Sequence, residues 1–149
     1  MEKTLKPAIN AYMVFLHYVS CLSPAMMLVV RLWIAHVFFA AGLVKISDFS
    51  NTIYLFTNEY HVPLLPPVAA AVLATTFELS CPVLLTLGLM ARLAALPLLV
   101  MTIIINFTYE NLTEHYYWSI LLGMIFFYGP GKLSLDYLAG KLYERKASI

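Results

Sequence analysis

Long apolar runs separated by short polar segments dominate the chain. Between residue 24 and Lys45, the only strongly polar side chains are Arg31 and His36. With a helical rise of about 1.5 Å per residue, a run of about 22 residues reaches roughly 33 Å, which is enough to cross the hydrocarbon core of a bilayer. A second run begins at Pro66-Pro67, a favourable helix start, and two shorter runs follow it. The pattern therefore predicts an all-α integral membrane four-helix bundle, with spans at about residues 24–45, 66–90, 92–109 and 113–129.

The residues before the first span have an amphipathic pattern. Apolar side chains recur at spacings of three and four from Ile9 to Val19, which predicts an N-terminal interfacial helix within residues 1–23. A cleaved signal peptide is the alternative, because Lys3 and Lys6 precede this apolar run. No A-x-A cleavage site follows, so the interfacial helix is the favoured prediction.

The segment after the first span also contains a helical pattern. Ile53, Phe56 and Tyr60 recur at spacings of three and four. The segment His61-Val62-Pro63 ends this pattern, since proline disfavours helical geometry in the residue before it. We therefore expect a short surface helix between the first two spans.

Composition and charge support a membrane protein and predict its orientation. Hydrophobic residues make up 62% of the chain and charged residues 11%, whereas soluble domains average roughly 45–50% and about 25%. The net charge of +1 gives no polyanion-seeking surface, so no nucleic-acid partner is expected. Lys45 stands alone on one side of the predicted spans, and seven cationic residues fall on the other side. These seven are Lys3, Lys6, Arg92, Lys132, Lys141, Arg145 and Lys146. Because positive loops stay in the cytoplasm, both termini are predicted to lie inside, with residues 130–149 as a cytoplasmic tail.

Ionisable side chains inside the predicted spans are the first candidates for function. A charge at the bilayer centre costs about a few kcal/mol even on the lenient insertion scale, so each needs a partner or a task. Arg31 and Lys45 share one face of the first span, and Glu78 lies among small residues on the second. We expect these faces to meet, so that Glu78 is neutralised by a cation in an intramembrane polar site. Depth favours Arg31 as this cation and side-chain direction favours Lys45, so both stay open, as do an architectural and a functional role for the pair.

Four other polar residues are secondary candidates. Thr102 and Asn106 lie four residues apart on the third span, where we expect interhelical hydrogen bonds. Arg92 lies at the inner end of the second span and His115 near an outer loop. No two His residues fall at one depth on facing spans, an outer metal site that uses His115 lacks compact ligand spacing, and no C-x-x-C motif is present. We therefore predict no bound metal and no covalently attached cofactor.

A series of ordered motifs runs from Arg31 to Leu138. They are Arg31-Leu32, Phe38, Ala41-Gly42-Leu43 and Lys45 in the first span, Glu78 in the second, Gly88-Leu89 and Arg92 near its inner end, and Gly129-Pro130-Gly131-Lys132-Leu133-Ser134-Leu135-Asp136 after the fourth. In this order they resemble the DoxX family, and the G-P-G-x-x-S-L-D ending is the most specific element. The resemblance implies a single domain over residues 1–149, located in the bacterial inner membrane. It supplies no catalytic residues, so the charged members are carried over only as motif positions.

The DoxX resemblance also implies two kinds of function. Some relatives are membrane subunits of quinone-linked oxidoreductases, including thiosulfate:quinone oxidoreductase, and others have roles in redox or metal stress. The segment from Tyr54 to Pro67 is similar to a bacterial subgroup often encoded beside proteins that modify copper-binding peptides, which links the family to copper homeostasis.

Two functional hypotheses follow from these observations. In the first, the chain is a membrane subunit that couples a partner protein to the quinone pool, with a quinone as a non-covalent ligand and no redox centre of its own. In the second, it is a non-catalytic anchor or assembly protein, whose docking surface would be residues 46–65. The expected contacts are the lipid bilayer, a protein partner and a second copy of the chain. A solute transporter is a third hypothesis, disfavoured because four spans leave little room for a pathway.

Overall fold

A computed structural model describes residues 2–109 and 113–147, with the surroundings of side chains 9–109 and 113–146. Over these residues the chain is helical and contains no strand, which confirms the all-α prediction. The helices are α1 (Glu2–Ser47), α2 (Phe49–Asn58), α3 (Pro67–Leu87), α4 (Ala91–Thr108), α5 (Thr113–Tyr128) and α6 (Leu135–Ala147). Helix α2 is the short helix expected between the first two spans, and it ends before the His61-Val62-Pro63 segment.

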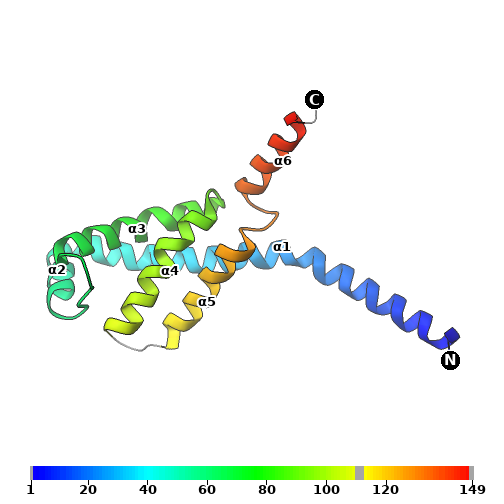
Figure 1. Cartoon of the computed structure of the whole chain (residues 1–149), viewed down its shortest axis with the longest axis horizontal. Helices are drawn as coiled ribbons and strands as arrows, with labels where there is room; N and C mark the ends of the chain where they lie inside the picture. Colours follow the sequence, from blue (N-terminus) through cyan, green and yellow to red (C-terminus); the bar gives the residue numbers. More distant parts are fainter. Residues whose placement is uncertain (1, 110–112, 148–149) are drawn as a thin grey trace.

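The long helices pack lengthwise around an apolar core. Figure 1 shows α3 running back along α1, with α4 and α5 forming a hairpin beside them. The core side chains come from all four of these helices, and those that are fully buried include Ile34, Leu85, Leu98, Leu122 and Ile125. Each packs against partners on neighbouring helices, so the four helices share one buried interior.

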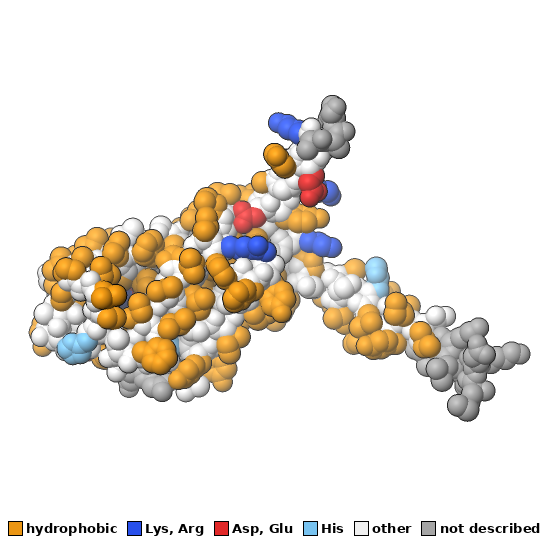
Figure 2. Space-filling model, in the orientation of Figure 1, with side chains coloured by type: hydrophobic (Ala, Val, Ile, Leu, Met, Phe, Trp, Pro, Cys, Tyr) orange, Lys and Arg blue, Asp and Glu red, His pale blue; other side chains and the backbone are white. Residues whose placement is uncertain are grey.

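The outer surface of the packed helices is apolar, as lipid contact requires. Figure 2 shows hydrophobic side chains spread over the exposed surface of the molecule. Among the described helices, three are long and apolar enough to cross a membrane, namely the stretch Ile9–Ser47 of α1, α3 and α4. Helix α5 has 16 residues and packs against α4. The chain is therefore a membrane protein with several candidate spans.

Helix α1 differs from the prediction, because it continues without a break through the expected boundary between residues 23 and 24. Pro24 removes only one backbone hydrogen bond, so it bends a helix without necessarily ending it. Figure 1 shows the N-terminal part of α1 turning away from the packed helices. The described side chains of this part, residues 9–23, are exposed, as at Tyr18 and Leu22, each 66% accessible. The position of residues 1–23 at a membrane surface stays a prediction.

The connection between α3 and α4 is longer than predicted, because it spans residues 88–90. We expected the second span to extend to residue 90, but α3 ends at Leu87 because Gly88 (φ 66°) and Met90 (φ 48°) both adopt left-handed geometry. The Asp136 carboxylate accepts hydrogen bonds from the Met90 N–H at 2.7 Å and the Ala91 N–H at 3.0 Å. The start of α6 thereby caps the start of α4, so residues 46 positions apart stabilise one turn.

Gly42 marks a close approach of α1 and α3. A Cβ atom at this position would lie 3.0 Å from Leu79 Cδ2 and 3.1 Å from the Glu78 backbone carbon. We expect Gly42→Ala to lower the free energy of unfolding by roughly 1–3 kcal/mol, because backbone atoms must move to admit the methyl group. Thermal unfolding of the protein in detergent, followed by circular dichroism, measures the effect.

Gly123 supplies the matched control, since a Cβ there meets no atom within 4 Å. Gly123→Ala should leave stability unchanged or raise it by up to about 1 kcal/mol through helix propensity. Equal melting temperatures for the two variants would show that the α1–α3 contact is looser than described.

Candidate functional site

Lys45 and Glu78 form a buried ion pair between α1 and α3. The Lys45 Nζ donates to Glu78 Oε2 at 2.7 Å and to Oε1 at 2.9 Å. The Lys45 side chain is 16% exposed and that of Glu78 is 4% exposed. The prediction that a cation from the first span neutralises Glu78 is confirmed, and Lys45 is that cation. Side chains lean toward the N-terminus of their own helix. Because α3 runs back along α1, a cation on α1 and an acid on α3 lean toward each other when the cation lies nearer the C-terminal end of α1 than the acid it faces, as Lys45 does.

Arg31 is fully buried but belongs to a different set of contacts. Its guanidinium donates from Nη1 to the Leu85 carbonyl at 3.3 Å and from Nη2 to the Leu133 carbonyl. A Cβ on Gly88 would collide with this guanidinium, so a side chain at residue 88 would displace it. Arg31 therefore ties α1 to the end of α3 and to the segment before α6. The three primary candidates do not form one cluster, because Arg31 lies apart from the Lys45–Glu78 pair.

A cavity of about 270 Å³ opens beside the Lys45–Glu78 pair. Its polar lining residues are Lys45, Tyr60, Glu78, Thr102, Tyr109 and His115. Its apolar lining includes Phe38, Met101, Ile105 and Trp118, from α1, α4 and α5. Phe38 and Trp118 meet edge to face with their ring centroids 5.8 Å apart. The cavity thus combines aromatic walls with a charged pair and several hydrogen-bonding groups, a composition typical of small-molecule sites.

Comparison with known protein families identifies the family to which the chain belongs. The DoxX family model matches residues 26–111, more than half of the chain. The chain belongs to the DoxX family. The matched region includes both members of the Lys45–Glu78 pair, while His115 and the G-P-G-x-x-S-L-D segment follow it. No curated protein and no solved structure matches the chain.

His115 joins the polar cavity of this DoxX protein from the first turn of α5. The side chain is 9% exposed, and its ring lies 5.1 Å from the Trp118 ring between centroids. Its Nδ1 atom is buried and has no hydrogen-bond partner among the described residues. A buried imidazole nitrogen without a partner is costly unless a ligand or water satisfies it.

We expected Thr102 and Asn106 to make hydrogen bonds to other helices, and the structure shows no such bond for either residue among the described residues. The Thr102 hydroxyl lines the cavity but donates to the Leu98 carbonyl of its own helix at 2.7 Å, so the prediction is wrong for this residue. A threonine in an apolar helix satisfies its hydroxyl most easily on the carbonyl four residues earlier. The Asn106 Oδ1 atom is buried without a partner among the described residues, outside the cavity lining.

Tyr60 is a cavity residue that the sequence pattern placed only in a short surface helix. Tyr60 lies just after α2, and its ring contacts Phe56 and Tyr109, each with centroids 4.9 Å apart. Burial raises the pKa of Tyr60, and the neighbouring Tyr109, Glu59 and Glu78 raise it further. The Tyr60 phenol therefore keeps its proton at neutral pH and can donate it in a hydrogen bond.

Arg92 belongs neither to the Lys45–Glu78 cavity nor to the contacts of Arg31. It lies at the opposite end of α4 from the Lys45–Glu78 cavity, where it lines a second cavity with Lys132. Over the described residues, no three His, Cys, Asp or Glu side chains come together as metal ligands. The candidate site of this DoxX protein is therefore the cavity beside Lys45 and Glu78.

The buried pair should be strongly coupled in stability. We expect Lys45→Met and Glu78→Leu each to lower the free energy of unfolding by roughly 3–5 kcal/mol, because each leaves a buried charged partner unpaired. The double variant Lys45→Met/Glu78→Leu should regain most of that loss, since no unpaired charge remains. Thermal unfolding of the four proteins in detergent measures the cycle.

Glu114→Gln is the control for loss of a carboxylate. Glu114 is exposed in the first turn of α5, so its replacement should change stability by less than about 0.5 kcal/mol. Additive effects of the Lys45 and Glu78 substitutions would contradict the ion pair.

Proposed function

We propose that this DoxX protein binds the head group of a membrane quinone beside the Lys45–Glu78 pair, and thereby couples a partner protein to the quinone pool. The observation that carries the proposal is the cavity itself, in which a buried ion pair faces aromatic and apolar walls between helices able to span a bilayer. A charged pair buried between such helices is costly, so we expect it to have a task beyond packing.

The lining residues fit a quinone head group. A quinone ring is flat and apolar, with carbonyl oxygens on opposite edges that accept hydrogen bonds. Phe38 and Trp118 supply aromatic walls, and Tyr60 supplies a protonated hydroxyl. The buried His115 Nδ1 atom has no hydrogen-bond partner in the described part of the chain, so in its protonated tautomer it would donate to a carbonyl. The volume of about 270 Å³ lies just below the roughly 300–1,000 Å³ of pockets for drug-sized ligands, which suits a single ring.

The charged residues would manage protons at this site. A bound quinone supplies two-electron chemistry that takes up two protons when the ring is reduced. Glu78 places its carboxyl group at the cavity wall, where in its protonated form it would pass a proton to a ring oxygen and be left as the carboxylate that pairs with Lys45. Lys45 pairs with that group and would stabilise negative charge on the ring oxygen. The apolar walls exclude water, which strengthens each of these interactions.

We further propose a four-span arrangement in the bacterial inner membrane, with both termini inside and residues 1–23 at the membrane surface. The asymmetric distribution of Lys and Arg supports this orientation. The electron donor in this proposal is a partner polypeptide, and a second copy of the chain is an additional candidate contact.

A role as a membrane anchor for a partner is the second candidate function. It is favoured by exposed apolar side chains beyond the packed helices, at Tyr54 (59%), Leu64 (102%) and Leu65 (43%). Exposed aromatic and aliphatic residues of this kind are common at protein interfaces. A pure anchor would bind no quinone at the Lys45–Glu78 cavity, so ligand binding distinguishes the two functions.

Trp118 provides a direct reporter of ligand binding. The sequence has two tryptophans, and the other, Trp33, is exposed on α1. In a Trp33→Phe background, a short-tailed ubiquinone or menaquinone should therefore quench Trp118 fluorescence with a saturable dependence on concentration. Substitutions Glu78→Gln and His115→Phe should each weaken binding roughly tenfold, about the effect of one lost hydrogen bond to a charged or buried group.

His36→Phe is the matched control, because His36 is exposed on α1 and lies outside the cavity lining. It should leave the quenching curve unchanged. Gel filtration of each variant in detergent checks that the fold is retained. Absence of saturable quenching, or equal quenching in the wild type and the His115→Phe variant, would refute the quinone site.

A further inference from the structure

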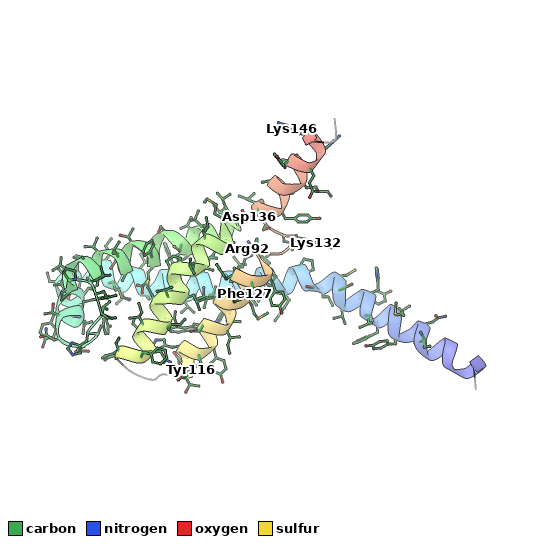
Figure 3. The ribbon with its side chains drawn as sticks, viewed as in Figure 1. Arg92, Tyr116, Phe127, Lys132, Asp136 and Lys146 are labelled. Atoms are coloured by element: carbon green, nitrogen blue, oxygen red, sulfur yellow. The ribbon has the colours of Figure 1, made fainter. Side chains whose placement is uncertain are left out.

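A second cavity, of about 480 Å³, lies where the α3–α4 turn meets the segment between α5 and α6. The side chains that matter for its chemistry are Arg92, Tyr128, Lys132, Ser134, Asp136 and Tyr137. Figure 3 shows Arg92, Lys132 and Asp136 gathered at this junction, although they come from separate segments of the chain. Neither the ion pair nor the aromatic walls of the first cavity contribute to it.

The charges around this second cavity are mainly positive. Arg92 and Lys132 are exposed, and no ion pair joins either of them to a carboxylate among the described residues. Asp136 is the one carboxylate in the lining. Both of its oxygens already accept backbone hydrogen bonds, from Met90 and Ala91. Two cations therefore face the cavity, while the single anion is engaged in capping α4.

The Arg92 guanidinium lies against the backbone of the segment after α5. Gly129 has φ 85°, and a Cβ there would lie 3.2 Å from Arg92 Nη2 and 3.3 Å from Nε. The glycine thus lets the guanidinium rest against the main chain. A guanidinium that already lies against the backbone has less conformational freedom to lose when a ligand binds. Its planar set of donors matches two oxygens of a phosphate group.

The surroundings of the cavity change from apolar to basic over a short distance. Leu93, Phe127 and Tyr128 next to it are 60%, 74% and 80% exposed. On the other side, the exposed Lys132 lies in the segment before α6. Figure 2 shows cationic side chains at the edge of the hydrophobic surface near the start of α6, and Figure 3 labels Phe127 close to Arg92. This is the boundary at which a phospholipid places its phosphate above its acyl chains.

We propose that the second cavity binds the phosphate group of an anionic phospholipid. Arg92 would make a two-oxygen contact and Lys132 a point-charge contact, while the exposed apolar residues pack along the acyl chains. Free inorganic phosphate shares this head-group chemistry. The exposed Leu93 and Phe127 beside the cations favour the lipid as the source of the phosphate.

Binding of defined ligands to the purified full-length protein tests this proposal. Native mass spectrometry in detergent would compare a short-chain phosphatidylglycerol, the matching phosphatidylcholine and inorganic phosphate. We expect phosphatidylglycerol to bind more tightly than the other two by tenfold or more. The variant Arg92→Gln/Lys132→Gln should lose roughly tenfold or more of this affinity, because each cation near an anionic lipid contributes several-fold.

The double variant Lys141→Gln/Lys146→Gln is the matched control. It also removes two positive charges, but from exposed positions of α6 outside the cavity. Its affinity for phosphatidylglycerol should therefore stay close to that of the wild type. The single variant Lys132→Gln changes an exposed residue between helices, which leaves the helices intact and should still weaken binding. Equal losses in both double variants, or equal affinity for phosphatidylglycerol and phosphatidylcholine, would overturn the proposal, as would inorganic phosphate binding as tightly as the lipid.

Discussion

The ion pair between Lys45 and Glu78 is the interaction on which the arrangement of α1 and α3 depends. Either charge alone would be expensive among apolar side chains, so the two helices must keep a register in which the charges meet. The close approach at Gly42, against the backbone of Glu78 itself, allows that register. Specific position, more than net stability, is what a buried pair of this kind provides. It also leaves a charged group at the wall of a cavity, where it can act on a ligand.

Arg31 fixes the other end of the same helix pair by a different kind of contact. Its guanidinium donates to the carbonyl of Leu85 near the end of α3, which also accepts from the Gly88 N–H, and to the carbonyl of Leu133 in the segment before α6. Asp136 performs the complementary task on the unpaired N–H groups at the start of α4. Two charged side chains thus bond to the backbone at the two ends of the α3–α4 turn, beside the backbone hydrogen bonds from Gly88 and Leu89 to the end of α3. The two cavities lie at opposite ends of this framework, one near the buried pair and one near the turn.

Much of the fold follows from the sequence, but the site follows only in part. Apolar runs of spanning length predict helices, and the cost of a buried carboxylate predicts that Glu78 has a cationic partner. The choice of Lys45 over Arg31 depends on the register of two helices, which depth counting along each helix does not determine. The place of Tyr60 depends on the path of the chain after α2, and Thr102 turned to its own helix because a carbonyl was available there. Local pattern thus predicts elements, while long-range packing decides which polar side chains meet.

The central claim is that a quinone head group occupies the cavity beside Lys45 and Glu78, and photo-crosslinking tests it most directly. The purified protein in detergent would be irradiated with an azidoquinone, and the labelled residues identified by peptide mass spectrometry. If the quinone binds there, we expect labels on cavity residues such as Tyr60, Met101 or Trp118. Excess unlabelled quinone and the His115→Phe substitution should each reduce this labelling. Labels confined to lipid-facing side chains, unaffected by competitor or by that substitution, would contradict it.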